Sequence, residues 1–432
     1  DQPAPDFYDL CDEAGLIVWA EIPFISVMSK DPAAHDNSRL QMTELVTQNI
    51  NHPSICFWGI SNEITIGGES PQLSEYLRDL NALVKSLDDT RLTTMTQVSM
   101  LPVTSDHNEI TDVVSYNHYF GWYNHTLARN EEWLDDFHAR FPDRPIGISE
   151  YGCEGVLSWH TENPQMRDYS ETYQATYHEH MCRVIDERPW LWATHVWNMF
   201  DFGVDSRDEG GVKGRNNKGL VTMDRKIRKD AFYVCKAYWS DEPFVRVMGR
   251  RFAQRDTSGT RISVATNLES VSLIVDGEVI ASGAGQRVHH FEDIRLEPGM
   301  HVVEVVSGDY RDVITLEAVE DLGDRYDLPG AEPGGHVPNW FEGLEGAAGG
   351  ELTFDPAYFS IKDTIKDLLA NGQVRVMLPA AVSTLGGMKL DAGMLGILGE
   401  QALESVLLGL FGGDLQSPQV AILNRELQRI PR

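Results

Sequence analysis

A chain of 432 residues is too long for a single compact core, so its length predicts two or three domains. Its 66 Asp and Glu residues against 36 Lys and Arg residues give a formal net charge of −30 at pH 7. A protein of this charge repels nucleic acids and anionic membrane surfaces, which excludes both as expected partners.

Residues 1–240 alternate short apolar runs with helical patterns. The apolar runs are continuous rather than alternating, which is typical of a parallel sheet covered on both faces. Strands and helices at this density predict an α/β barrel or a doubly wound sheet. Strands are predicted over 16–23, 55–63, 91–97, 112–120, 145–152 and 193–202, and helices over 7–15, 38–54, 71–88, 131–141 and 170–188. One face of the second helix is expected to carry Leu40, Met42, Leu45 and Ile50.

The pattern changes after about residue 240. Residues 241–319 contain strands alone, one pair joined by an Asp276-Gly277 turn, and predict an immunoglobulin-like β-sandwich. Residues 320–352 are rich in Gly, Pro and acidic side chains and are expected to form a linker.

The C-terminal region, residues 353–432, is predicted to be helical. Its first helix is expected to begin with Ser360 as N-cap, to bury an Ile361/Ile365/Leu368 stripe and to stop at an Asn-Gly pair.

The cysteines and the first residues bear on location. Five cysteines are scattered along the chain without C-x-x-C pairing, which is typical of reduced thiols in a cytoplasmic protein. No apolar run approaches the roughly 18 residues that span a membrane. The chain has no initiator Met, so its true N-terminus is expected upstream and a signal peptide stays open.

Two predicted strands end in carboxylates. The strand FWGISNE ends at Asn62-Glu63, and PIGISEYG contains Glu150 near its end. In an α/β barrel, ligand and catalytic groups lie at the carboxyl ends of strands. A single Glu in this position is most simply a helix-capping or solvated loop residue. A pair of them suits glycoside hydrolysis, which needs one carboxyl to protonate the leaving oxygen and another to attack.

Four segments in this order resemble glycoside hydrolase family 2, the family of β-galactosidases and β-glucuronidases: NHPSICFWGISNE, PIGISEYG, HVWNMFDF and NNKGLVTMDRKIRKDAFY. The resemblance covers residues 1–240 and extends over the sandwich. It implies a (β/α)8 TIM-type barrel and a retaining exo-glycosidase with a two-carboxylate double-displacement mechanism.

The resemblance implies a role for each matching residue. Glu63 would be the general acid/base and Glu150 the nucleophile, about 5 to 5.5 Å apart as in retaining enzymes. Asn62 would bond the sugar 2-hydroxyl. Tyr119 corresponds to the family tyrosine beside the nucleophile. Trp197 corresponds to the tryptophan on which the sugar packs, although a plain core position is the alternative.

No metal or cofactor is expected. Family members that bind magnesium use an acid and a nearby His after one strand, and here Glu21 is kept but Pro23 stands where the His would lie. His178 and His180 are two positions apart on a predicted helix and point apart, so both are expected at the surface.

The family barrel has eight strands, and six are predicted here. The resemblance places the first two upstream of Asp1, so the chain is expected to be the C-terminal portion of a longer, homo-oligomeric enzyme. A barrel with two unpaired edges is expected to be poorly stable by itself.

Two family substrates compete. Residues 200–226 resemble the β-galactosidase branch over a long stretch, so hydrolysis of terminal β-D-galactosides is the first expectation. Asn216-x-Lys218 resembles the signature with which β-glucuronidases hold the sugar carboxylate, and a Lys suits an anionic uronate. Against the β-glucuronidase alternative, Lys218 could simply pair with an acid in 205–211.

A reading of another class is a carbohydrate-binding fragment without catalysis. It would keep its aromatic residues and lose a carboxylate, whereas Glu63 and Glu150 are both present. The enzyme is therefore the favoured interpretation.

Overall fold

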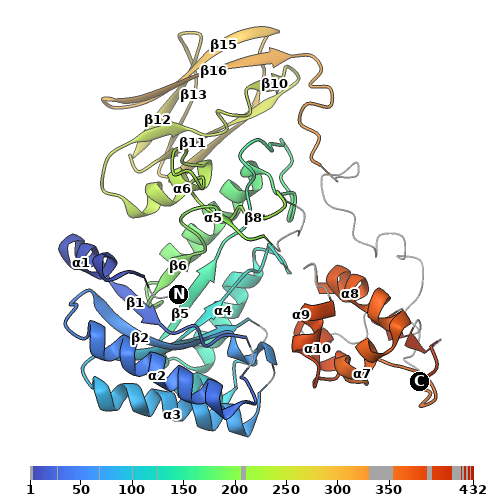
Figure 1. Ribbon diagram of the computed structural model, residues 1–432. Helices are drawn as coiled ribbons and strands as arrows, with labels where there is room; N and C mark the ends of the chain where they lie inside the picture. Colours follow the sequence, from blue (N-terminus) through green and yellow to red (C-terminus); the bar gives the residue numbers. More distant parts are fainter. Residues whose placement is uncertain are drawn as a thin grey trace.

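The computed structural model describes residues 3–26, 28–67, 69–99, 101–123, 125–205, 211–329, 354–386, 392–410, 420, 423–424, 427–428 and 430–432. Figure 1 shows three parts in chain order: a parallel sheet with helices around it, an antiparallel β region, and a group of short helices.

The first part is built on one parallel sheet of six strands, the number that the sequence predicts. Neighbours along the chain are neighbours in the sheet, from β1 to β6, and every pair is parallel. This order is that of a (β/α) barrel and not of a doubly wound sheet. The strands are β1 (Val18–Glu21), β2 (Ile55–Asn62), β3 (Leu92–Val98), β4 (Val113–Asn117), β5 (Ile146–Tyr151) and β6 (Thr194–Val196).

The sheet curls so that its two outer strands approach one another. The ring of Trp19 in β1 lies 5.7 Å from that of Trp192, just before β6, and 5.8 Å from that of His195 in β6. Phe57 of β2 also contacts Trp192, with ring centroids 4.6 Å apart. Aromatic side chains thus fill the concave side of the sheet between strands that are far apart in its order.

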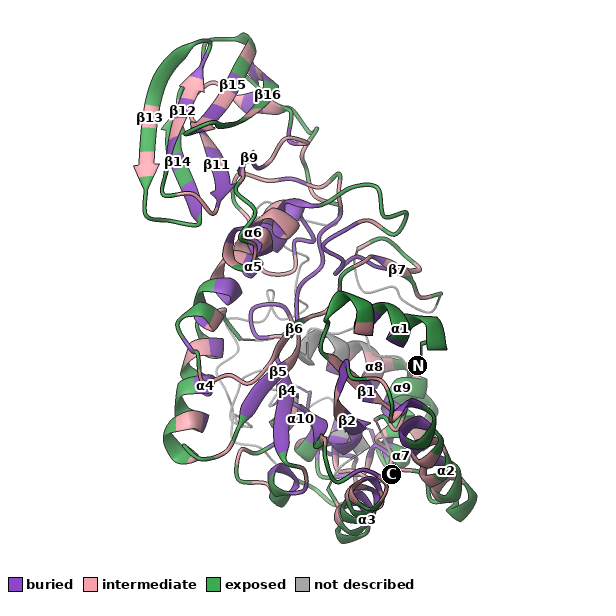
Figure 2. Cartoon of the chain, turned by 90° about the vertical axis from the view of Figure 1, so that its left-hand side faces the viewer, coloured by how far each residue is buried: buried purple, intermediate pink, exposed green. Residues whose placement is uncertain are grey.

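Helices cover the convex side. Figure 2 shows β4 and β5 largely buried while α2, α3 and α4 present exposed outer faces. The helices are α1 (Pro5–Ala14), α2 (Pro32–Asn49), α3 (Pro71–Leu87), α4 (Arg129–Arg140), α5 (Glu171–Asp186) and α6 (Asp230–Trp239). As predicted, the first helix ends at Gly15, whose φ of +67° a side chain would disfavour.

The predicted face of α2 is wrong in one residue. Met42 and Leu45 are buried, but Leu40 is 55% exposed. Two positions on an α-helix are about 200° apart, so Leu40 points away from Met42. The buried face instead begins at Ser38, one turn before Met42.

The second part is a two-sheet sandwich, antiparallel except for the parallel pair of β10 and β16. Five strands pair in the order β10-β16-β15-β12-β13 and three in the order β14-β11-β9. Asp276 and Gly277 form the predicted turn between β12 and β13, both with positive φ. The strands are β9 (Val245–Val247), β10 (Gln254–Asp256), β11 (Thr260–Thr266), β12 (Ser270–Val275), β13 (Glu278–Ala284), β14 (Val288–Ile294), β15 (Gly299–Ser307) and β16 (Tyr310–Val319).

The C-terminal part is helical, as predicted, but Ser360 is not a helix cap. The helix starts four residues later, where Thr364 Oγ1 accepts the backbone N–H of Asp367. Ser360 Oγ instead accepts the N–H of Lys362 in a turn. The expected apolar stripe is buried. The helices are α7 (Ile365–Ala370), α8 (Gly372–Gly386), α9 (Ala392–Ile397) and α10 (Leu403–Leu410).

The domain boundaries expected from the sequence, at residues 240, 319 and 352, stay predictions. Most of the expected linker, residues 330–352, lies outside the described residues.

Within the described ranges, no helix combines the length and the apolar character that a bilayer-spanning segment needs. The five cysteines carry free thiols, although Sγ of Cys182 lies 3.9 Å from Sγ of Cys235.

Candidate active site

The residues expected at the site come from the carboxyl ends of four strands of the parallel sheet. Asn62 ends β2 and Glu63 follows it, while Glu150 lies one residue before the end of β5. Tyr119 follows β4, and Trp197 follows β6. Parallel strands end at the same edge of a sheet, so this edge gathers an amide, two carboxyls, a phenol and an indole.

Asn117, the last residue of β4, joins the two carboxylates. Its Nδ2 donates to Oε1 of Glu63 over 3.0 Å and lies 3.2 Å from Oδ1 of Asn62. Its amide also bonds Glu150, and its Oδ1 accepts the hydroxyl of Ser149 over 2.8 Å. Sequence reasoning missed Asn117, although the available signal was the one that singled out Asn62: an amide at the end of an apolar strand.

The backbone of Glu63 has an unusual conformation. Its φ is +48°, in the left-handed region that costs a non-glycine residue about 1–2 kcal/mol. Its N–H is held by the carbonyl oxygen of Thr96 in β3, 2.9 Å away. Such strain is typical of functional positions, where surrounding contacts fix a side-chain direction that a relaxed backbone would not give.

The environment of Glu63 favours its protonated form. Burial, followed by the negative charge of Glu150, raises the pKa of Glu63 to about 7, and the bond from Asn117 opposes that rise. Near neutral pH this carboxyl can therefore both give and take a proton.

Glu150 has a different environment. Burial raises its pKa as well, but the hydroxyl of Tyr119 and the ammonium of Lys218 favour its carboxylate form. The Tyr119 hydroxyl donates to Oε2 of Glu150 over 2.5 Å. Two neighbouring carboxyls whose surroundings differ in this way suit an acid and a nucleophile.

Glu21, at the end of β1, is a third acid near this site. Burial, then the charge of Glu150, raises its pKa to about 7. Its side chain occupies the space beside Gly59 of β2, where a Cβ would lie 2.5 Å from the Cβ of Glu21. The absence of a side chain at Gly59 thus makes room for Glu21 inside the sheet.

Among the described residues, one group of acids and His has metal-like spacing, and it lies away from this site. Asp9, Asp12 and His52 come from α1 and from the turn before β2, at the amino end of the strand. Asp12 accepts His52 Nδ1 over 2.7 Å and the N–H of Ser54 over 2.9 Å. These bonds explain the cluster as an anchor for α1.

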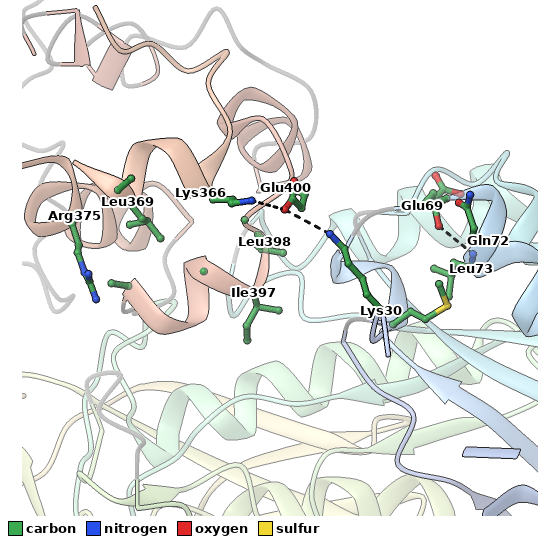
Figure 3. Close-up of a pocket in the computed structure, with 16 residues that line it drawn as sticks. Lys30, Glu69, Gln72, Leu73, Lys366, Leu369, Arg375, Ile397, Leu398 and Glu400 are labelled. Atoms are coloured by element: carbon green, nitrogen blue, oxygen red, sulfur yellow. Dashed lines mark hydrogen bonds and ion pairs between the residues drawn. The ribbon is translucent and has the colours of Figure 1, made fainter. Parts of the chain in front are cut away.

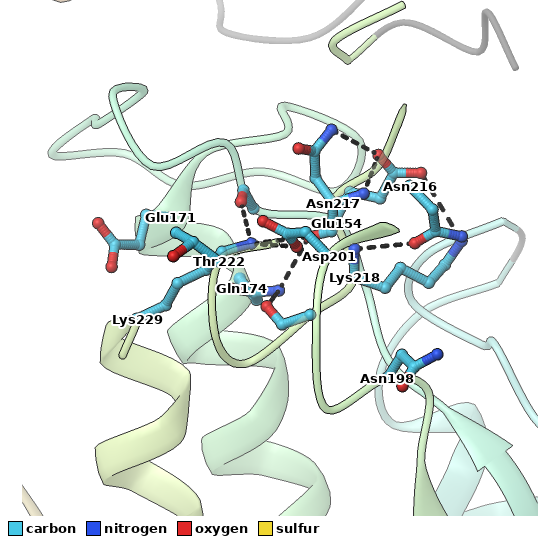
Figure 4. A network of polar contacts seen from close by, with 12 residues as sticks. Glu154, Glu171, Gln174, Asn198, Asp201, Asn216, Asn217, Lys218, Thr222 and Lys229 are labelled. Carbon is cyan, nitrogen blue, oxygen red and sulfur yellow. Dashed lines mark hydrogen bonds and ion pairs between the residues drawn. The ribbon is translucent and has the colours of Figure 1, made fainter. Parts of the chain in front are cut away.

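Lys218 is buried beside Glu150 and not at the rim. It is 2% exposed, and its Nζ lies 2.7 Å from the Tyr123 hydroxyl. It also lies 5.5 Å from the ring centroid of Tyr119 and 3.7 Å from Oε1 of Glu154. Figure 4 shows dashed lines that join Lys218 to Glu154 and to Asn216. Its acidic neighbour is therefore Glu154, which sequence reasoning did not consider, and not Asp205.

Asn216 and Trp197 lie on the same side of the site. Asn216 is buried in the short strand β8 (Arg215–Asn216), and its Oδ1 accepts the N–H of Lys218 over 2.9 Å. Trp197 is half-buried, with its N–H bonded to the Tyr151 carbonyl and its ring 5.9 Å from that of Phe202. A half-buried ring next to β5 fits a sugar platform better than the core position.

The expectation for His178 is wrong. His178 is fully buried on α5, close to Cys235 of α6, whereas His180 is half-buried. Helix α6 packs against this side of α5. The sequence of α6 is apolar, but it does not show which face of which helix it will cover.

A separate cavity of about 820 Å³ lies where the start of α3 meets α7 and α9 (Figure 3). Neither Glu63 nor Glu150 lines it. Glu400 lies in this cavity with its Oε1 3.6 Å from Lys30 Nζ and 3.2 Å from Lys366 Nζ. Arg375, Glu69 and several apolar side chains complete the lining.

Comparison with known proteins identifies relatives of this chain. The family model described as the TIM barrel domain of glycosyl hydrolases family 2 matches residues 3–242. A β-glucuronidase of Bacteroides fragilis is 36% identical over 336 residues, which cover 73% of this chain and 47% of that protein.

Solved structures give a similar picture. An FMN-binding β-glucuronidase from Facaelibacterium prausnitzii L2-6 is 54% identical, with a TM-score of 0.74 over 75% of this chain and 50% of that one. A putative β-galactosidase from Bacteroides fragilis is 31% identical, with a TM-score of 0.68 over 74% of this chain and 48% of that one. The chain thus spans half or less of the length of these relatives.

Proposed function

Because the chain belongs to glycoside hydrolase family 2, we propose that it carries the catalytic site of a retaining β-glucuronidase. Glycoside hydrolase activity follows from the family. The expected preference for β-D-galactosides is not confirmed, since the curated relative and the more similar of the two structures described above are β-glucuronidases.

The position of Lys218 is the main observation that favours a glucuronide over a galactoside as the substrate. A buried ammonium needs compensating charge, and the nearest acid oxygen, on Glu154, is 3.7 Å away, too far for a direct hydrogen bond. The C6 carboxylate of a glucuronide bound against Glu150 would supply a further negative partner, in direct hydrogen-bonding contact, beside Glu154 and Glu150. The neutral C6 hydroxyl of a galactoside would not.

The two carboxylates divide the chemistry in this proposal. Glu63, with a pKa of about 7, gives its proton to the glycosidic oxygen as the bond from C1 to that oxygen breaks. Glu150 attacks C1 from the opposite face and forms a glycosyl ester. Glu63, now a carboxylate, then takes a proton from the water that displaces Glu150. The products are the alcohol and the free sugar acid.

Other side chains bind the sugar in this proposal. Asn62 meets the 2-hydroxyl, Trp197 packs on the ring, and Asn216 and Lys218 hold the C6 carboxylate. Tyr119 keeps Glu150 ionised and directed at C1. All of these residues come from strand ends or from segments that follow them, on one edge of the sheet.

The test is a comparison of kcat/KM for an aryl β-glucuronide and the matching aryl β-galactoside. We expect the glucuronide to be cleaved at least ten times more efficiently. A preference for the galactoside would overturn the glucuronidase proposal, while Glu150→Gln should abolish both activities under either outcome. If Glu150→Gln retained turnover, the two-carboxylate mechanism itself would be wrong.

We also propose that the cavity beside α3 binds flavin mononucleotide. A relative that is 54% identical is an FMN-binding β-glucuronidase. The lining carries three cations against two acids, and this net positive charge suits a phosphate monoester. Leu73, Ile397 and Leu398 offer an apolar surface for the flavin ring. Bound flavin supplies redox chemistry, whereas the glycosidase steps above use side chains.

Flavin fluorescence measures this binding. Titration of the protein into FMN should quench the fluorescence, and Arg375→Glu should weaken the binding. Riboflavin, which lacks the phosphate, should bind more weakly, and Glu63→Gln should bind FMN like the wild type. Absence of quenching, or equal affinity for riboflavin, would contradict the assignment.

A further inference from the structure

We propose that Lys229 is a positioning residue that fixes Lys218 for its contact with an anionic sugar, so that it sets substrate selectivity from a distance. This inference rests on the glucuronidase function proposed above. Lys229 precedes α6 and is completely buried. It makes no contact with the space beside Glu150 where the sugar would lie, and it acts through the segment that carries Lys218.

The ammonium of Lys229 makes three short contacts. Its Nζ lies 2.7 Å from the carbonyl oxygen of Gly155, 2.8 Å from Oδ1 of Asp201 and 3.0 Å from the carbonyl oxygen of Asn217. An ammonium has three protons to donate, so every one is used. Asp201 supplies the counter-charge, and the two carbonyls belong to two neighbouring segments, since the N–H of Gly155 bonds the carbonyl oxygen of Asn217.

The carbonyl of Asn217 is held by further donors. The N–H of Gly155 reaches it over 3.0 Å, and Nε2 of Gln174 lies 3.3 Å away. The same Nε2 lies 3.3 Å from the carbonyl oxygen of Gly219. Figure 4 shows Lys229 and Gln174 approaching this segment from the same side. The carbonyl of the peptide that immediately precedes Lys218 is therefore held by three donors.

Asn217 also contacts Glu154, the acidic neighbour of Lys218. Its backbone N–H and its Nδ2 lie 3.3 and 3.4 Å from Oε2 of Glu154. The other oxygen of Glu154 faces Nζ of Lys218 at 3.7 Å. The carboxylate that faces Lys218 is thus oriented by the segment that Lys229 holds. A shift of Asn217 would move the Lys218 backbone and its acidic neighbour together.

The β-sandwich stabilises this arrangement. The N–H of Asp230, the residue after Lys229, donates to Oε1 of Glu171 over 2.9 Å. Arg251, between β9 and β10, donates from its Nε to Oε2 of Glu171 over 2.8 Å. The buried carboxylate of Glu171 therefore links Arg251, from the sandwich, to the backbone next to Lys229.

The test is the selectivity of Lys229→Met. We expect kcat/KM for an aryl β-glucuronide to fall about 10- to 100-fold, mainly through KM, because a misplaced Lys218 no longer meets the carboxylate. For the matching neutral aryl β-glucoside or β-galactoside the loss should stay within about threefold. Lys236→Met, which removes the partner of the exposed Glu242 and lies on α6 away from Lys218, should change neither value.

A double-mutant cycle separates positioning from general damage. In a Lys218→Ala background, Lys229→Met should change the glucuronide selectivity by less than twofold, because both changes act on one contact. Equal losses on charged and neutral substrates, or full additivity with Lys218→Ala, would overturn the inference. If the wild-type enzyme prefers galactosides, the glucuronidase proposal is wrong. That result can be told apart from failure of the Lys229 inference, because it is measured on the wild type alone.

Gln174→Leu covers the case in which Lys229→Met does not fold. It removes the neutral donor to the Asn217 carbonyl, together with its bonds to the carbonyls of Gly219 and Cys153, and leaves the Lys229–Asp201 pair intact. The expected result is a threefold to tenfold rise in KM for the glucuronide with little change for the neutral substrate. An unchanged ratio between the two substrates in this variant would also overturn the inference.

Discussion

The hydroxyl of Tyr119 donates a 2.5 Å hydrogen bond to Oε2 of Glu150. Tyr119 follows β4 and Glu150 lies in β5, so two adjacent strands hold the pair together. A short bond from a phenol stabilises a carboxylate more than the corresponding acid, and here it opposes the effect of burial on the pKa of Glu150.

Tyr119→Phe should therefore raise the pKa of Glu150. We expect the acidic limb of the kcat/KM profile to move to higher pH and kcat to fall about 10- to 100-fold. Tyr116→Phe is the matched control, since Tyr116 lies in β4 and its hydroxyl bonds Asn108 and not Glu150. A profile that stays in place in Tyr119→Phe would contradict this role for the bond.

Glu63→Ala should affect substrates according to their leaving groups. Alkyl glycosides need a proton on the departing oxygen and should lose activity by about 100-fold or more, whereas activated aryl glycosides should lose far less in the first step. The alkaline limb of the wild-type profile, expected near pH 7 from the pKa of Glu63, should disappear in this variant. Equal losses on both classes would show that Glu63 is not the acid.

Lys218→Ala should lower kcat/KM for an aryl β-glucuronide by about 30- to 1000-fold, which corresponds to about 2 to 4 kcal/mol for a charge-assisted contact at a desolvated site. The matching β-galactoside should change modestly. Lys226→Ala, an exposed lysine in the same stretch, serves as the control. A small effect on the glucuronide would favour a structural role for Lys218.

The order of the strands and the two carboxylates could be predicted from the sequence because both depend on local patterns. Continuous apolar strands separated by helices leave few other arrangements, and Glu63 and Glu150 interrupt such strands at their ends. The partners of Lys218 could not be predicted in this way. Tyr123 and Glu154 are 95 and 64 positions away, and the fold alone brings them to Lys218.

The failures elsewhere have similar causes. The spacing of Leu40, Met42, Leu45 and Ile50 predicts one buried face, but positions 40 and 42 are about 200° apart on a helix, and Leu40 points to solvent. Ser360 resembles a helix cap in the sequence. The N-cap of α7 is instead Thr364, four residues later, because its hydroxyl accepts the free backbone N–H of Asp367 in the first turn. His178 is buried by α6, a helix more than 50 residues away in the chain.

Glu63→Gln should change stability in a pH-dependent way. The pKa of Glu63 rises from 4.5 to about 7 on folding, so the folded state binds the proton more tightly than the unfolded chain does. The stability that this provides is complete below about pH 4.5 and is lost as pH rises through about 7, a loss of about 3 kcal/mol. Glu63→Gln stays neutral and keeps its stability, so its midpoint for urea unfolding relative to wild type should be clearly higher at pH 8 than at pH 5.

Glu44→Gln on the exposed face of α2 should show no such change. Equal differences at the two pH values would mean that Glu63 is already ionised in the folded protein at pH 5, and the proton-donor role would then have to go to another group.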